Sequence, residues 1–345
     1  MNQITLTIDG FEVTTREGAS VLEAALDYGI HIPHLCHHPD LVPVGVCRMC
    51  GVEIRERPGV VMSCITPATE GMIVSTESKA VNDCRRMAME LLLANHQGDC
   101  LTCDENNRCD LQQAAAFVGI DHERMQRLRR PAQLMPADSS NPFFEFDPNK
   151  CILCGICVRT CDEILGVNAI DYFYRGYGTK IGTSGSKNWV DSVCVSCGEC
   201  VVRCPVGALT SKHMQRPARE VKTTCVYCGV GCGIYLGVRG NQVVSVRGDR
   251  DRPTNRGRLC VKGRYGYDFI NHPQRLTKPL IKKNGEFVEA SWDEALDLVA
   301  ARFSEARGRF AAFTSAKATN EDNFLVQKFT RAVMRTNSID HCARL

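Results

Sequence analysis

Residues 151–161 read CILCGICVRTC, and residues 194–205 read CVSCGECVVRCP. Each stretch contains four cysteines with the spacing C-x2-C-x2-C-x3-C, and Pro205 follows the second stretch where Asp162 follows the first. Three thiolates this close together can bind three corners of one iron–sulfur cubane, and the fourth cysteine then points away from it. The two stretches therefore predict two [4Fe–4S] clusters.

The fourth cysteine of each stretch is predicted to bind the cluster of the other stretch, as it does in two-cluster ferredoxins. The first cluster is assigned to Cys151, Cys154, Cys157 and Cys204. The second cluster is assigned to Cys161, Cys194, Cys197 and Cys200. Structural zinc is the alternative, but zinc usually binds separated CxxC pairs rather than triplets.

Three further groups contain most of the remaining cysteines. The spacing C-x10-C-x2-C-x13-C comprises Cys36, Cys47, Cys50 and Cys64. The spacing H-x3-C-x2-C-x5-C comprises His96, Cys100, Cys103 and Cys109. The spacing C-x2-C-x3-C-x27-C comprises Cys225, Cys228, Cys232 and Cys260.

Of the 21 cysteines in the 345 residues, only Cys84 and Cys342 lie outside these five groups. Cys84 lies on the apolar side of a predicted helix and is expected to be a core residue. Cys342 is expected to be structural or to lie next to the metal ligands without being one.

The composition excludes several classes of protein. With 42 basic and 39 acidic residues the formal net charge is +3, so the chain is not a strongly basic nucleic-acid binder. Hydrophobic residues make up 44% and charged residues 23%, which is ordinary for a globular protein and excludes a disordered chain. No apolar run approaches the length of a transmembrane helix.

The first residues, MNQITLTIDG, alternate apolar and polar side chains and contain no signal peptide. A cytoplasmic protein is therefore expected. Many cysteines without an export signal indicate metal or redox chemistry rather than disulfides.

Periodicity predicts small α and β elements between the ligand groups. ITLTID and FEVTT within residues 3–15 are predicted to be strands around a turn at Gly10, and Ser20 is predicted to cap the helix VLEAALDYG. A helix over residues 79–95 is expected to bury one face, made of Val81, Cys84, Met87, Ala88, Leu91 and Leu92.

Residues 111–150 are predicted to contain a helical stretch, a basic run from Arg124 to Arg130, and a linker near 136–142. The basic run is interpreted as a solvated face or a subunit contact. After Cys260 the sequence predicts a helix in SWDEALDLVAARFSEA capped by Ser291, a strand in GRFAAFTSA and a helix from Asn320 to Arg335. These elements indicate the beginning of an α/β domain.

Two stretches of the last group suggest a family. TCVYCGVGCG at 224–233 and GRLCVKGRYGYDFINHPQRLTKPLI at 257–281 resemble the start of the molybdenum or tungsten bis-pterin oxidoreductases, and most of all the formate dehydrogenase catalytic subunit. The resemblance implies that Cys225, Cys228, Cys232 and Cys260 bind a [4Fe–4S] cluster. It also implies that Lys262 lies between this cluster and the pterin and helps electrons to cross.

The first two groups resemble the large iron–sulfur subunits of respiratory complex I and of iron-only hydrogenases. There the Cys36-type group binds a [2Fe–2S] cluster, and the His96-type group binds a [4Fe–4S] cluster through one histidine and three cysteines. Because imidazole is neutral and thiolate is anionic, the histidine is expected to raise the cluster's reduction potential.

The resemblance covers the whole chain and implies an α+β multidomain protein. Five domains are expected: a β-grasp [2Fe–2S] ferredoxin (1–78), a His/Cys3 [4Fe–4S] domain (79–140), a two-[4Fe–4S] bacterial ferredoxin (141–215), a small β-rich [4Fe–4S] domain (219–275) and the beginning of a pterin-binding α/β domain (276–345). Residues 315–323, SAKATNEDN, resemble the first pterin-domain loop. Their side chains, above all Ser315, Asn320 and Glu321, are suited to hydrogen-bonding a pterin guanine dinucleotide.

The last residues, TNSIDHCARL, resemble the family's approach to the cysteine or selenocysteine that ligates the metal. The hypothesis is that a UGA selenocysteine codon follows Leu345, which would make the natural protein an anaerobic selenoprotein. A chance boundary is the alternative.

The resemblance implies formate and CO2 interconversion by the complete enzyme, with a molybdenum or tungsten bis(pterin guanine dinucleotide). Electrons would pass Lys262, the Cys225 cluster, the two ferredoxin-like clusters, the His96 cluster and the [2Fe–2S] cluster, in that order. The chain itself is expected to transfer electrons without oxidising formate, because the metal-ligating residue lies outside it.

No flavin or nicotinamide site is predicted on this chain. Reduction of NAD(P) would therefore require a flavin-containing NAD(P)H-binding subunit, with ferredoxin or hydrogenase subunits as other partners. An electron-transfer subunit of complex I or of an NAD-linked hydrogenase is the alternative function. A zinc-rich scaffold without a redox role is a third.

Overall fold

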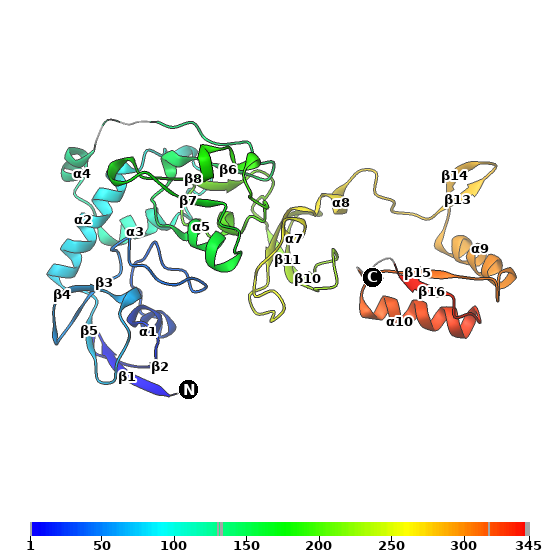
Figure 1. Ribbon diagram of the computed structural model, residues 1–345, viewed down its shortest axis with the longest axis horizontal. Coiled ribbons are helices and arrows are strands. Elements are labelled where there is room, and N and C mark those ends of the chain that lie inside the picture. Colours follow the sequence, from blue (N-terminus) through cyan, green and yellow to red (C-terminus); the bar gives the residue numbers. More distant parts are fainter. Residues whose placement is uncertain (1, 130, 132–133, 317, 342–345) are drawn as a thin grey trace. The chain divides into compact units, whose positions relative to one another are not determined.

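A computed structural model describes residues 2–129, 131, 134–316 and 318–341. The chain forms two compact units, Met1–Lys212 and His213–Leu345 (Figure 1). Both units combine helices and strands, as the α+β prediction requires. No helix within the described ranges is long and apolar enough to cross a membrane.

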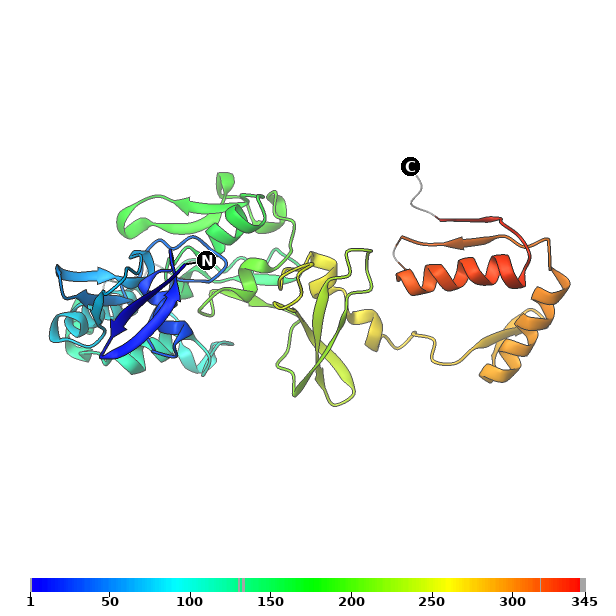
Figure 2. The ribbon, with the colours of Figure 1, turned by 90° about the horizontal axis from the view of Figure 1, so that it is seen from below.

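The first unit begins with a five-stranded sheet, seen at the N-terminal end in Figure 2. The strand order is β2-β1-β5-β3-β4, with β1 at Gln3–Ile8, β2 at Phe11–Arg16, β3 at Gly51–Ile54, β4 at Arg57–Met62 and β5 at Ile73–Ser75. Asp9 and Gly10 have positive φ angles of 50° and 85°, which suits a tight hairpin turn. The predicted hairpin is confirmed.

Helix α1 (Val21–Asp27) packs its buried side on the core of this sheet. The Ser20 side chain accepts a hydrogen bond from the Glu23 amide, and the Glu23 carboxylate accepts one from the Ser20 amide. This capping box satisfies amides that the first helical turn leaves open. The helix start predicted at Ser20 is confirmed.

Helix α2 (Lys79–Asn95) has the predicted bounds but a different buried face. Met87 and Leu91 are 42% and 45% exposed, whereas Arg85 and Glu90 are buried. Arg85 donates to the carbonyl oxygens of Met49 and Gly51 at 3.1 and 2.8 Å, so its polar group is satisfied inside the protein. Cys84 is half-buried and packs against the sheet core.

Helices α3 (Asp110–Val118) and α4 (His122–Leu128) follow α2. Arg124 binds the fully buried carboxylate of Glu90, with the Nη2 to Oε1 distance 2.9 Å. Arg129 donates to the carbonyl oxygen of His96 at 3.3 Å. Arg129 is exposed, as the interpretation of the basic run as a solvated face expects, whereas Arg124 departs from that interpretation because it is half-buried against Glu90. Arg130 lies outside the described residues.

The rest of the first unit is built from short elements. They are β6 (Phe144–Phe146), α5 (Ile156–Arg159), β7 (Ile170–Phe173), β8 (Lys180–Thr183), α6 (Glu199–Val202) and β9 (Leu209–Ser211). Strand β6 pairs with β9, and β7 pairs with β8. Helices α5 and α6 each begin after a left-handed glycine, Gly155 or Gly198, at the same place in the two cysteine stretches. The predicted repeat is thus a structural repeat.

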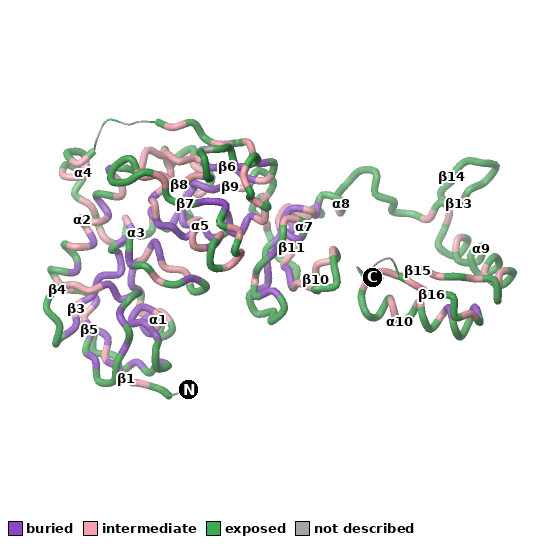
Figure 3. The backbone as a smooth tube through the Cα atoms, viewed as in Figure 1, coloured by how far each residue is buried: buried purple, intermediate pink, exposed green. Residues whose placement is uncertain are grey.

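The predicted linker near 136–142 belongs to this fold. Asp138 pairs with Phe146, and Asn141 is buried, with its side-chain amide donating to the Ser196 hydroxyl at 2.8 Å. Buried residues of the first unit lie around the cysteine stretches and also in the N-terminal sheet, as Figure 3 shows.

The second unit contains a three-stranded antiparallel sheet followed by smaller elements. They are β10 (Arg219–Thr224), β11 (Gly233–Arg239), β12 (Gln242–Gly248), α7 (Val261–Tyr265), α8 (Asp268–Asn271), β13 (Leu280–Lys283), β14 (Glu286–Glu289), α9 (Trp292–Glu305), β15 (Ala312–Thr314), α10 (Asn320–Lys328) and β16 (Ile339–His341). The predicted cap at Ser291 is confirmed, since its hydroxyl accepts from the Glu294 amide at 3.1 Å. The last predicted helix is shorter than expected, because α10 changes into a π-helical turn at Phe329–Val333.

Candidate iron–sulfur sites

The Cys36 set lies inside the first unit, and its four cysteines are at most 7% exposed. The thiols form two hydrogen-bonded pairs, Cys36 with Cys47 and Cys50 with Cys64. The bond from Cys47 lowers the pKa of Cys36, and the bond from Cys64 lowers the pKa of Cys50. Two pairs of sulfur ligands, one for each iron, are what a [2Fe–2S] cluster needs.

The His96 set lines a single cavity together with Gly98, Asp99, Asn106, Gln112 and Gly207. His96 follows the last residue of α2, and Cys109 precedes the first residue of α3, so two helix ends bring the ligands together. The Nδ1 atom of His96 is buried and has no hydrogen-bond partner among the described residues. Burial lowers the pKa of this imidazole, which keeps it in the neutral form that binds metal.

Glycines give the His96 cavity its space. A β-carbon at Gly98 would lie 2.9 Å from the His96 Nε2 atom, and one at Gly207 would collide with the Cys103 sulfur. The two glycines therefore leave room that any other residue would fill.

The two ferredoxin-like sets line two separate cavities. One is lined by Cys151, Cys154, Cys157 and Cys204, and the other by Cys161, Cys194, Cys197 and Cys200. The structure thus brings Cys204 to the first stretch and Cys161 to the second, which is the crossed arrangement expected from the spacing. Phe144 and Trp189 close the second cavity, with ring centroids 5.2 Å apart.

Burial keeps several of these thiols protonated in the absence of a metal. Desolvation raises the pKa of Cys204 to about 11, and it also raises the pKa values of Cys157 and Cys200 well above the ordinary value of a thiol. Thiolate, not thiol, binds iron, so cluster binding here would release protons.

The Cys225 set lies in the second unit, beside the β10–β12 sheet. The Cys225 amide donates to the Cys232 carbonyl oxygen at 2.8 Å. Burial raises the pKa values of Cys225 and Cys232, and the nearby charges of Cys228 and Cys260 also raise them. Cys228 and Cys260 are exposed. The four thiols therefore lie close together at the surface of this unit.

Lys262 lies in α7, two residues after Cys260, and borders the same cavity as Cys225 and Tyr227. The cavity measures about 250 Å³. Gly263 forms part of its wall, and a β-carbon there would lie 3.6 Å from the Cys225 sulfur. The lysine is exposed, and its predicted role between cluster and pterin stays a prediction.

The three predicted pterin contacts lie around one loop. Ser315 follows β15, while Asn320 and Glu321 begin α10 and are exposed. Asn323, which the sequence did not single out, holds this loop by donating to the Ser315 carbonyl oxygen at 3.2 Å. Cys342 and Leu345 lie outside the described residues, so their predicted roles stay predictions.

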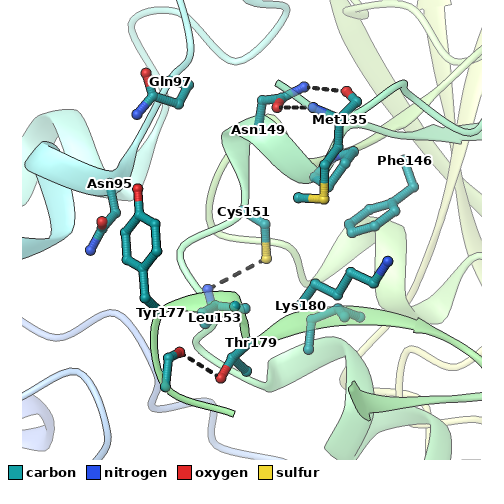
Figure 4. Close-up of a pocket in the computed structure, with 14 residues that line it drawn as sticks. Asn95, Gln97, Met135, Phe146, Asn149, Cys151, Leu153, Tyr177, Thr179 and Lys180 are labelled. Atoms are coloured by element: carbon teal, nitrogen blue, oxygen red, sulfur yellow. Dashed lines mark hydrogen bonds between the residues drawn. The ribbon is translucent and has the colours of Figure 1, made fainter. Parts of the chain in front are cut away.

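A cavity of about 220 Å³ is lined in part by Cys151 (Figure 4). Asn95, Gln97, Asn149, Tyr177 and Thr179 contribute polar groups to its wall. The Leu153 amide donates to the Cys151 sulfur at 3.4 Å beside it. The cavity gives one face of this cysteine stretch access to solvent.

The donor sets fit iron–sulfur clusters better than single ions. A zinc ion holds sulfur ligands about 2.3 Å away, and no three His, Cys, Asp or Glu side chains of the described residues converge around such a point. The His96 set and the two ferredoxin-like sets instead each place four sulfur or imidazole donors around one cavity.

Sequence reasoning missed the arginines that join these sites. Arg85 binds the carbonyls on both sides of Cys50, and Arg159 binds the carbonyl oxygen of Cys36 at 2.6 Å. Neither lies in a ligand motif of the set that it contacts, so local spacing could not reveal it.

Five family models match successive segments of the chain. They describe a 2Fe-2S iron-sulfur cluster binding domain (1–79), the NADH-ubiquinone oxidoreductase-G iron-sulfur binding region (85–124), a 4Fe-4S dicluster domain (150–208), the molybdopterin oxidoreductase Fe4S4 domain (218–272) and molybdopterin oxidoreductase (275–345). All five ligand sets lie within the first four segments.

A solved structure shows the same likeness over a longer part of the chain than any one family model. A chain in the crystal structure of an NAD+-reducing [NiFe]-hydrogenase in the H2-reduced state is 34% identical, with a TM-score of 0.56. The match covers 61% of the present chain and 87% of the hydrogenase chain. The present chain belongs to the family of iron–sulfur oxidoreductases that includes this hydrogenase chain and the molybdopterin oxidoreductases with the same iron–sulfur domains.

Several curated members of this family align with nearly the whole chain. "Putative formate dehydrogenase YrhE" of Bacillus subtilis is 33% identical over 100% of the chain. An NADH-quinone oxidoreductase subunit of Rhizobium meliloti is 36% identical, and the NADPH-Fe(3+) oxidoreductase subunit alpha of Geobacter sulfurreducens is 37% identical, each over 99% of the chain. The chain spans 40% of the length of each of these relatives.

Proposed function

We propose that this chain is the iron–sulfur electron-transfer portion of a formate dehydrogenase, which exchanges electrons between formate and an NAD(P)- or ferredoxin-linked partner. The observation that carries the proposal is Lys262, which borders one cavity with Cys225 at the start of the molybdopterin oxidoreductase segments. The likeness to a named formate dehydrogenase over the whole chain supports it.

Five clusters are proposed, one [2Fe–2S] at the Cys36 set and one [4Fe–4S] at each of the other four. When bound they would supply one-electron transfer, and a molybdenum or tungsten bis(pterin guanine dinucleotide) in the complete protein would supply the exchange with formate. The proposal also includes the five domains expected from the sequence. It includes Ser315, Asn320 and Glu321 as contacts of the pterin.

The chain's own residues bind the clusters, exclude water and adjust charge. Cys157 and Cys200 are buried in the first unit, so clusters there would be largely shielded from water. Neutral His96 reduces the negative charge at its site, which favours the reduced state. Lys262 offers a positive charge beside the Cys225 set.

The contacts favour a different order of sites from the one that the resemblance implied. The loop at residues 36–46, called the Cys36 loop, contacts residues 151–204, called the two-cluster segment. The Val42 amide donates to the Glu163 carboxylate at 2.8 Å. Cys103 contacts Gly207 of the same segment. We therefore propose that the Cys36 and His96 sites each exchange electrons with the ferredoxin-like pair, without the His96 site standing between them.

The test uses the full-length protein with its partner subunits, purified without oxygen. Formate is expected to reduce the clusters of the unmodified protein, as seen by visible absorption and EPR. Lys262→Met should keep its iron and its reduction by dithionite, and should slow reduction by formate at least tenfold. Lys282→Met, an exposed lysine of β13, is the matched control. Molybdenum- or tungsten-loaded protein whose clusters formate leaves oxidised would contradict the proposal.

A second candidate is an electron-transfer subunit that does not react with formate. It is favoured by the relatives named as an NADH-quinone oxidoreductase and an NADPH-Fe(3+) oxidoreductase, which are 36% and 37% identical. It predicts that NADH or NADPH reduces the clusters through a flavin subunit, whereas formate does not. Reduction by formate would exclude it.

A further inference from the structure

Arg159 is the last residue of α5, and its side chain reaches from the two-cluster segment to the loop that contains Cys36. Its Nη1 atom donates to the Val42 carbonyl oxygen at 2.7 Å, and its Nη2 atom donates to the Cys36 carbonyl oxygen at 2.6 Å. Glu163, in the turn that continues α5, accepts from the Val42 amide at 2.8 Å. Both polar groups of the Val42 backbone are therefore bound by the two-cluster segment.

The position of Arg159 places one positive charge near three ligand sets. Arg159 lies in sequence between Cys157 and Cys161, which belong to two different sets, and it binds the backbone of Cys36 in a third. Its Nε atom is buried and makes no hydrogen bond within the described part of the chain.

Two of the neighbouring acidic groups, Asp40 and Glu199, are paired with a different arginine. Asp40, between Cys36 and Val42 in the same loop, and Glu199 both form ion pairs with Arg203. Glu163 binds the Val42 amide. A cluster gains one negative charge when it is reduced, and a nearby cation in a weakly polar environment stabilises that form.

We propose that Arg159 is a positioning residue that holds the Cys36 loop against the two-cluster segment and makes the [2Fe–2S] cluster easier to reduce. The inference rests on the proposed [2Fe–2S] site at Cys36, Cys47, Cys50 and Cys64. It goes beyond that function by naming the residue that sets the geometry and the potential of the contact between two sites.

The test compares redox titrations of the full-length, anaerobically purified protein, followed by the EPR signal of the reduced [2Fe–2S] cluster. In Arg159→Gln the positive charge is lost, and the reduction equilibrium is expected to become at least tenfold less favourable, a fall of about 59 mV in midpoint for one electron. Arg57→Gln removes an exposed arginine from β4 of the first unit and should leave the midpoint unchanged.

Two further variants separate charge from position. Arg159→Lys keeps the charge but cannot make both hydrogen bonds, so the midpoint should stay near that of the unmodified protein while amide hydrogen exchange in residues 36–46 becomes faster. Glu163→Gln also loosens this loop, but it removes a negative charge, so the midpoint should not fall. These two variants decide the matter if Arg159→Gln fails to retain its cluster.

The inference is overturned if Arg159→Gln has the midpoint potential of the unmodified protein and its rate of amide hydrogen exchange in residues 36–46. It is also overturned if the midpoint potential falls as far in Arg159→Lys as in Arg159→Gln. If the unmodified full-length protein shows no EPR signal of a [2Fe–2S] cluster, the proposed function is contradicted instead. This result is distinguishable because it is obtained before any variant is compared.

Discussion

The sulfur atom of Cys103 packs against Gly207, so closely that a β-carbon on Gly207 would collide with it. Gly207 lies three residues after Cys204, which belongs to the Cys151 set, whereas Cys103 belongs to the His96 set. The Asp110 amide donates to the Pro205 carbonyl oxygen at 3.0 Å and holds the two segments together. The His96 site and the first ferredoxin-like site thus share a wall of only a few residues.

Gly207→Ala is expected to displace Cys103 and to prevent the His96 cluster from forming. The protein should then contain about 14 iron atoms per chain in place of about 18, because one [4Fe–4S] cluster is lost. Iron and acid-labile sulfide analysis of anaerobic protein measures this. Gly178→Ala is the control, since a β-carbon at Gly178 would meet no atom within 4 Å. Full iron content in Gly207→Ala would show that the contact does not matter.

The crossed arrangement of Cys161 and Cys204 can be tested by pairs of substitutions. Cys151→Ser with Cys204→Ser removes two ligands from one cavity, so one cluster, about 4 iron atoms, should be lost. Cys151→Ser with Cys161→Ser removes one ligand from each of two cavities and should damage both clusters. The opposite pattern of losses would mean that each stretch binds its own cluster with its own four cysteines.

Phe144 is 1% exposed and packs edge-to-face on Trp189 beside the Cys200 cavity. Phe144→Ala should lower the free energy of unfolding of the first unit by about 3–5 kcal/mol, through lost burial and the cavity that remains. Phe11→Ala, at a 57% exposed position, is the control and should have little effect. Chemical denaturation of the anaerobic protein, followed by near-UV circular dichroism, compares the midpoints. Equal midpoints would refute the packing argument.

Removal of iron should affect the protein unevenly. Helices α5 and α6 have four residues each and carry proposed cluster ligands, and helices this short are not stable without tertiary contacts. Chelation is therefore expected to speed amide hydrogen exchange at residues 151–164 and 194–204. Helix α9, with 14 residues and no ligand, should exchange at an unchanged rate. Uniform acceleration across both regions would argue against cluster-dependent order.

The sequence was most informative where ligands are close together along the chain. The triplets Cys151–Cys157 and Cys194–Cys200 define their cavities locally, because each triplet contains a glycine-started helix turn that orients the thiols. Capping residues such as Ser20 and Ser291 also act within one helical turn, so the helix starts could be predicted.

The features that the sequence did not reveal depend on contacts between distant segments. Arg85 and Glu90 occupy inward positions of α2 because carbonyl oxygens and Arg124 satisfy them, whereas periodicity favoured apolar Met87 and Leu91 there. Arg159 binds a loop more than a hundred residues earlier in the chain. Such partners are defined only once the segments pack together.

The central claim is that the five ligand sets bind iron–sulfur clusters, and metal analysis of anaerobically purified protein tests it most directly. We expect about 18 iron atoms per chain, from one [2Fe–2S] and four [4Fe–4S] clusters, with a similar amount of acid-labile sulfide and EPR signals of both cluster types after reduction. A colourless protein that contains zinc in place of iron and labile sulfide would contradict the claim.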